Sequence, residues 1–134
     1  KIEKHVIFYG KKFGDQLNQI YDLADIGVEC LANFRQMDMV TVSSALKSRE
    51  YAAKGLPVIC STEIDIMPSE RYEYVLKVPD NDTPICIEDV IHFYNKIYVK
   101  DRNEVINSIR NYAMQRCSME IAMKPVLELF SEKE

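Results

Sequence analysis

The chain has 134 residues, of which 47% are apolar and 28% are charged, and its formal net charge at pH 7 is −4. These values are typical of one compact domain that buries a core without disulfides or a structural metal. The acidic balance disfavours a general nucleic-acid-binding protein, and no apolar run is long enough to span a bilayer. The four cysteines lie 30, 26 and 31 residues apart, so we expect free thiols in a reducing cytoplasm and no zinc site.

Strand-like and helical patterns alternate through the first half of the chain, and helical patterns fill the second half. In chain order we expect a strand at 6–9, a helix at about 15–24, a strand at 26–31, a polar loop at about 32–42, a helix at 43–54 that begins at serines and ends at Gly55, strands at 57–60 and 74–78, and helices at about 87–98, 101–116 and 119–131.

Short strands separated by helices of about ten residues predict crossover connections, and therefore a parallel sheet with helices on both faces. The predicted fold class is a Rossmann-like α/β fold, in which ligands bind beyond the carboxyl ends of the strands. We expect one partial domain over 1–134, with the alternating part in 1–80 and the helices in 81–134. The sheet is small and three helices follow one another at the end of the chain, so we expect more of the sheet upstream.

The second expected helix has an unusual charge pattern at its beginning. It carries Lys47 and Arg49 near its first turn and no acidic residue before Glu50, and Arg35 lies in the preceding loop. A helix amino-terminus has free N–H groups and a partial positive charge, so cations there are unfavourable unless an anion binds among them. The pattern therefore indicates a phosphate site. A simpler interpretation stays open, in which both cations extend into water and Glu50 pairs with Lys54.

Four segments together resemble a known family. The residues at 46–59 read L-K-S-R-E-Y-A-A-K-G-L-P-V-I, which is similar to the segment K-x-x-E-Y-x-A-x-G-x-P-V-I of the family 4 retaining GT-B glycosyltransferases. The residues at 24–31 resemble that family's A-D-I-x-V-x-x-S strand, and those at 6–10 and 17–21 its V-x-F-x-G … L-x-x-x-Y stretch. Order and spacing agree across residues 5–60, so the resemblance implies the carboxyl-terminal part of a GT-B nucleotide-binding domain.

The resemblance also implies a donor site around the start of the helix that carries Glu50. In the family, the glutamate at this position hydrogen-bonds the ribose hydroxyls, and backbone N–H groups before it bind the diphosphate. We expect Lys47 to be catalytic by stabilising the departing nucleoside diphosphate. The remaining expected donor-binding residues are Ser44, Ala45, Leu46, Arg35 and Arg49. No metal and no cofactor is expected, because the cationic side chains and the helix end would balance the negative charge of the phosphates.

The implied enzyme transfers a sugar, with retention, from a nucleoside diphosphate to a glycan or a lipid-linked acceptor. We expect it in the cytoplasm, with peripheral association at the inner face of the membrane, and without a nucleic-acid partner. The family's basic pair and acceptor domain lie upstream, so we expect the chain alone to be inactive and its open sheet edge to favour self-association. Many members have a second glutamate where this chain has Val42, so one contact near the donor sugar is missing.

Two other function classes stay open from the sequence. A nucleotide-sugar epimerase would use a similar domain, and a non-enzymatic α/β interaction module would show an exposed apolar patch. Glu63 and Asp65 follow the third strand and could contact a sugar hydroxyl, although we interpret them as ordinary loop carboxylates. His5 and His92 have no acidic cluster near them, so they do not indicate a metal site.

Overall fold

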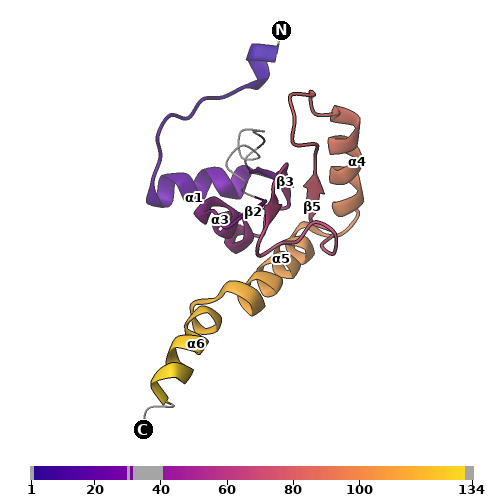
Figure 1. Cartoon of the computed structure of the whole chain (residues 1–134). Coiled ribbons are helices and arrows are strands. Elements are labelled where there is room, and N and C mark those ends of the chain that lie inside the picture. Colours follow the sequence, from indigo (N-terminus) through magenta and orange to yellow (C-terminus); the bar gives the residue numbers. More distant parts are fainter. Residues whose placement is uncertain (1, 30, 32–40, 132–134) are drawn as a thin grey trace.

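The computed structural model describes residues 2–29, 31 and 41–131 (Figure 1). Three strands form a parallel sheet in the order β1-β3-β5, namely β1 (Gly27–Val28), β3 (Val58–Cys60) and β5 (Val75–Lys77). The central strand β3 is buried at all three positions, as expected for a parallel strand covered on both faces. A second parallel pair joins β2 (Val42–Ser43) to β4 (Glu63–Ile64). The chain is therefore a mixed α/β protein.

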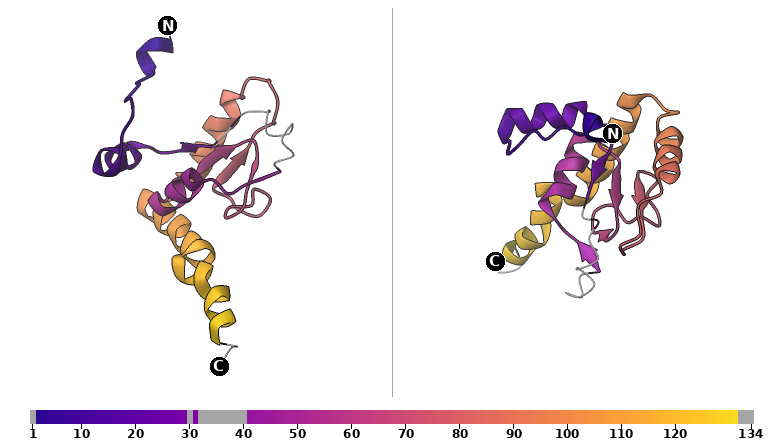
Figure 2. Two further views of the ribbon diagram at one scale, coloured as in Figure 1. Left: turned by 60° about the vertical axis from the view of Figure 1, so that its left-hand side comes forward. Right: turned by 90° about the horizontal axis from the view of Figure 1, so that it is seen from above.

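Helices flank this sheet. Within the described ranges, the helices are the 3-10 turn η1 (Ile2–His5), α1 (Gly14–Leu23), α3 (Leu46–Lys54), α4 (Ile87–Ile97), α5 (Arg102–Cys117) and α6 (Met119–Ser131). The strands lie between α3 on one side and α4 on the other, whereas α6 projects away from the sheet (Figures 1 and 2). In the part of the chain that the structure describes, no helix is both long and apolar enough to cross a bilayer.

The core lies where α3, α4 and α5 meet the sheet. Side chains of Ala52 from α3, Val58 from β3, Phe93 from α4, and Val105 and Ile109 from α5 belong to one buried cluster. The helices therefore use the spacing expected of amphipathic segments, with one face toward the sheet. The helices expected at about 87–98 and 101–116 are confirmed, and the helix expected at 43–54 is present with a later beginning.

Two predictions about the first half of the chain are wrong. Residues 6–9 form no strand and are exposed, and Phe8 keeps 91% of its surface open to solvent. A strand needs a neighbouring strand for its hydrogen bonds, and none of the described strands pairs with this segment. The helix expected at 43–54 is α3, which begins at Leu46, because Ser43 pairs with Ile64 of β4 as part of strand β2. Its N-cap is Ala45, which provides no side-chain hydrogen bond.

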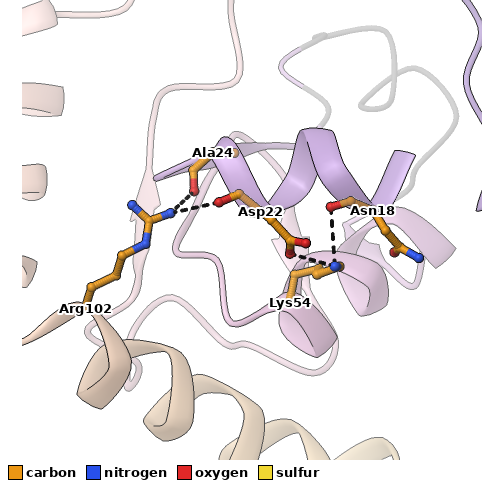
Figure 3. A network of polar contacts seen from close by, with 5 residues as sticks. All are labelled: Asn18, Asp22, Ala24, Lys54 and Arg102. Carbon is orange, nitrogen blue, oxygen red and sulfur yellow. Dashed lines mark hydrogen bonds and ion pairs between the residues drawn. The ribbon is translucent and has the colours of Figure 1, made fainter. Parts of the chain in front are cut away.

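α1 has no fully buried residue, and polar contacts help to hold it against the rest of the chain. The Lys54 ammonium lies 2.7 Å from the Asp22 carboxylate and also donates to the carbonyl of Asn18 (Figure 3). From the start of α5, Arg102 donates to the carbonyls of Asp22 and Ala24 at the end of α1 (Figure 3). A guanidinium at this position complements the negative end of the helix dipole. These contacts fix the face of α1 that borders α3.

Candidate functional site

Buried polar residues gather at the carboxyl edge of the sheet. Burying a polar group is unfavourable unless it finds a partner, so such residues are informative when they cluster. In the described part of the chain, the buried polar or charged residues are Glu29 after β1, Ser43 in β2, Ser48 in the first turn of α3, and Ser61 and Thr62 after β3. All five belong to the edge where α/β sheets bind their ligands.

Glu29 is the charged member of this group. Its backbone N–H continues the sheet by donating to the carbonyl of Ile59 at 2.9 Å, which fixes the residue directly beyond β1. Its side chain is only 1% exposed, and its Oε2 lies 3.8 Å from the ammonium of Lys47. That separation is too long for a hydrogen bond, and Oε2 has no hydrogen-bond partner among the described residues. The structure thus brings a buried carboxylate to the first turn of α3.

The other cation of this turn is also paired with a carboxylate. One nitrogen of Arg49 lies 2.8 Å from Asp65, which follows β4. Asp65 is held there because its N–H donates to the carbonyl of Ser43 in β2. Since Lys47 and Arg49 both face acidic side chains, the interpretation in which they extend freely into water is wrong. Arg35, the third expected cation, lies outside the described residues.

The expected phosphate-binding amides lie partly before the helix. Ser44 is exposed and Ala45 is the N-cap, so only Leu46 and Lys47 belong to the first turn of α3. The first N–H groups of a helix have no intrahelical partner. No acidic residue lies in this first turn, so its amides and dipole form an electropositive end that opens at the carboxyl edge. Val42, which occupies the position of the missing glutamate, is half exposed in β2.

Glu50 faces α1 rather than the cations. Its Oε2 accepts a 2.8 Å hydrogen bond from the Tyr21 hydroxyl, and both residues line a hollow of about 270 Å³ between α1 and α3. Burial and the hydrogen bond to Glu50 raise the pKa of Tyr21 to about 12, so Tyr21 remains a donor at neutral pH. Lys54 pairs with Asp22 of α1, so the predicted Glu50–Lys54 pair is not formed. The contact between Tyr21 and Glu50 was not predicted from the sequence.

A second acidic group lies farther along the same edge. Glu63 accepts hydrogen bonds from the N–H and hydroxyl of Ser69 and from the ammonium of Lys77, the latter at 2.9 Å. Partial burial acts to raise the pKa of Glu63, but these donors outweigh it and hold the pKa below its usual value. Glu63 and Asp65 therefore both have partners within the chain, as ordinary loop carboxylates do.

The described residues show neither a metal-binding cluster nor a reactive cysteine. Among the residues that the structure describes, no three His, Cys, Asp or Glu side chains are placed to hold a metal ion. Cys60, Cys86 and Cys117 are free thiols, and Cys30 lies outside the described residues. Burial raises the pKa of Cys60 to about 11, so this thiol is a core residue rather than a nucleophile.

Comparison of the chain with protein-family models, with curated proteins and with solved structures finds no match. The site must therefore be interpreted from its own chemistry. Sequence reasoning missed its most unusual residue, Glu29. The available signal was a charged residue within the otherwise apolar run expected to form the strand at 26–31.

Proposed function

We propose that this chain is part of a GT-B-type glycosyltransferase and carries the phosphate and ribose half of its nucleotide-sugar site. The observation that supports this most directly is the cluster of five buried polar residues at the carboxyl edge, beside the open amino-terminus of α3. A fold that needed only stability would fill this edge with apolar side chains, because buried polar groups contribute little net stability. A phosphate-bearing ligand would bind to the open helix end and form hydrogen bonds with the buried polar groups beside it.

In this proposal, the first turn of α3 binds the diphosphate. The N–H groups of Leu46 and Lys47 point along the helix axis toward the edge, and the Lys47 side chain is 43% exposed, which leaves its ammonium accessible. As the bond between the anomeric carbon and the diphosphate oxygen breaks, the electron pair remains on the diphosphate. Lys47 and the helix end stabilise that charge, which is the usual role of fixed cations and dipoles in group transfer. Arg35 and Arg49 assist in holding the phosphates.

Glu50 binds the ribose hydroxyls in this proposal. A carboxylate has about four acceptor positions, and the Tyr21 hydroxyl uses one of them. The remaining positions can accept two neighbouring hydroxyl groups, while the hydrogen bond from Tyr21 fixes the orientation of the carboxylate. The acceptor, a glycan or a lipid-linked saccharide, takes the sugar with retention. It would be bound by a part of the protein other than this chain.

A nucleotide titration tests the proposal. Amide NMR spectra of isotope-labelled protein would be recorded with UDP, GDP and ADP up to millimolar concentration. We expect one nucleotide to shift amides of residues 43–51 and Glu50→Gln to weaken that response. Glu73→Gln is the matched control, because Glu73 pairs with Lys100 and is not part of the edge. Absence of shifts with all three nucleotides, or equal effects of the two variants, would exclude the proposed site.

An interaction module is the second candidate, and one observation favours it. Large apolar side chains are exposed on the amino-terminal segment and on α6, including Phe8 at 91%, Leu127 at 61% and Phe130 at 67%. Exposed apolar surface of this kind marks contact with another protein or another part of the same protein. If the chain fails to bind nucleotides, this becomes the better interpretation.

A further inference from the structure

We propose that Glu29 is an internal counter-anion of Lys47, which the phosphate of the donor must displace or share. This inference rests on the proposed function, because it concerns the same phosphate site. It assigns a role to Glu29, the buried carboxylate among the described residues of the carboxyl edge, and it predicts that this carboxylate lowers nucleotide affinity.

The first argument is the burial of Glu29. Its carboxylate is 1% exposed, and only one cation, the half-exposed Lys47, forms an ion pair with it among the described residues. An ionised carboxylate taken out of water needs a compensating charge or several hydrogen-bond donors. Among the described residues, Oε2 has no hydrogen-bond partner, and the ammonium of Lys47 is the cation that compensates this carboxylate.

The second argument is the geometry of the pair. At 3.8 Å, the ammonium and carboxylate attract each other without the directional hydrogen bond that would fix the lysine. Lys47 also belongs to the turn whose N–H groups form the electropositive end of α3. The lysine can therefore face Glu29 in the free protein and turn toward a phosphate at the helix end. A phosphate there and the Glu29 carboxylate share the same ammonium and repel each other.

The neighbouring carboxylates differ from Glu29 in this respect. Asp65 forms a 2.8 Å pair with Arg49, and Glu63 is held by Ser69 and by Lys77 at 2.9 Å. Asp65 and Glu63 therefore each form a hydrogen-bonded ion pair, and their side chains are more exposed than that of Glu29. Among the described carboxylates of this edge, Glu29 thus differs in being almost fully buried and in facing its cation without a hydrogen bond.

The substitution Glu29→Gln tests the inference, with Glu63→Gln as the matched control. Each change removes one negative charge from the same edge, but only the first removes the counter-anion of Lys47. Two anions about 7 Å apart at an effective dielectric constant between about 20 and 80 repel enough to change binding by about 3- to 50-fold. We expect Glu29→Gln to tighten the dissociation constant for UDP, GDP or ADP within this range, and Glu63→Gln to change it less than twofold. Thermal unfolding of each variant reports whether it folds, and Glu29→Met replaces the first variant if it does not.

Each outcome separates the inference from the proposed function. If the unmodified chain binds a nucleotide and the Glu29 variant binds it with equal or lower affinity, the counter-anion role is wrong and the donor site stands. If only the Glu29 variant binds, the counter-anion role is supported, and the unmodified chain is not a donor-binding domain by itself. If neither binds, both proposals are overturned.

Discussion

Gly55 is the position where the fold tolerates a side chain least, and Gly55→Ala is therefore a direct test of the packing of α3. Gly55 ends α3 with φ +74°, and its N–H and that of Leu56 bond to the carbonyls of Ala52 and Tyr51. This is the Schellman arrangement, in which the left-handed residue is usually glycine. A Cβ atom at this position would lie 2.7 Å from the Cα of Ile106 and 2.8 Å from its carbonyl oxygen.

Two effects contribute to the expected loss of stability. A non-glycine residue in the left-handed region costs about 1–2 kcal/mol, and forcing an atom into a packed contact costs about 1–3 kcal/mol. The atoms that would clash belong to the backbone of α5, so they cannot rotate away. We therefore expect Gly55→Ala to lower the free energy of unfolding by about 2–5 kcal/mol, measured by urea denaturation followed by circular dichroism.

Gly10→Ala provides the matched control. Gly10 has a similar φ of +67°, but a Cβ atom there would meet nothing within 4 Å. We expect this variant to lose only the backbone contribution of about 1–2 kcal/mol, since no atom lies close enough to clash. Equal losses in the two variants would refute the close contact between α3 and α5.

Three further predictions concern the surroundings of the site. Glu50→Gln should lower the pKa of Tyr21 from about 12 toward 10.0, which NMR of labelled tyrosine rings would detect. In the unmodified protein, the raised pKa of Tyr21 stabilises the fold below about pH 10, and this stabilisation is lost as the pH rises toward 12. Arg102→Ala should speed deuterium uptake in α1 and reduce stability by about 1 kcal/mol, because it removes the contacts at the end of α1; unchanged uptake would contradict this role. Alkylation of the folded protein should label exposed Cys86 and spare buried Cys60, as read by mass spectrometry, and equal labelling would contradict the burial of Cys60.

The helices and the central strands could be predicted from the sequence because their signals are local. Apolar residues at helical spacing placed α4, α5 and α6 within one residue of their observed bounds. Gly55 correctly marked the end of α3, since its role depends on backbone conformation alone. The apolar runs that became β1, β3 and β5 are also local patterns, although the strands are shorter than expected.

The failures arise where structure depends on a partner elsewhere in the chain. Residues 6–9 have the composition of a strand, but composition does not provide the neighbouring strand that would pair with them. The strands β2 and β4 have two residues each, too few for any periodic pattern, and they exist because Val42 pairs with Glu63 and Ser43 with Ile64. The same pairing shortened α3 at its beginning. Non-local pairing cannot be read from one sequence by propensity.

The candidate site was harder to predict for a related reason. The cations near the start of α3 were visible in the sequence, but their partners, Glu29 and Asp65, come from segments 18 and 16 residues away. The charge pattern alone suggested an unpaired electropositive end. The structure instead shows Lys47 facing Glu29 and Arg49 paired with Asp65. Because these partners are distant in the sequence, the charge pattern alone could not reveal the compensation.

This compensation constrains how the edge could hold an anion. Ion pairs with Glu29, Asp65 and Glu63 neutralise Lys47, Arg49 and Lys77 respectively. The chain as a whole carries a net charge of −4, so long-range attraction does not favour a phosphate. Affinity would have to come from short-range contacts, namely the free N–H groups at the start of α3 and the ammonium of Lys47. Because the Lys47–Glu29 pair is the longest of the three and is too long for a hydrogen bond, Lys47 can turn toward a phosphate without breaking one. The cost is that the buried Glu29 carboxylate loses its cation.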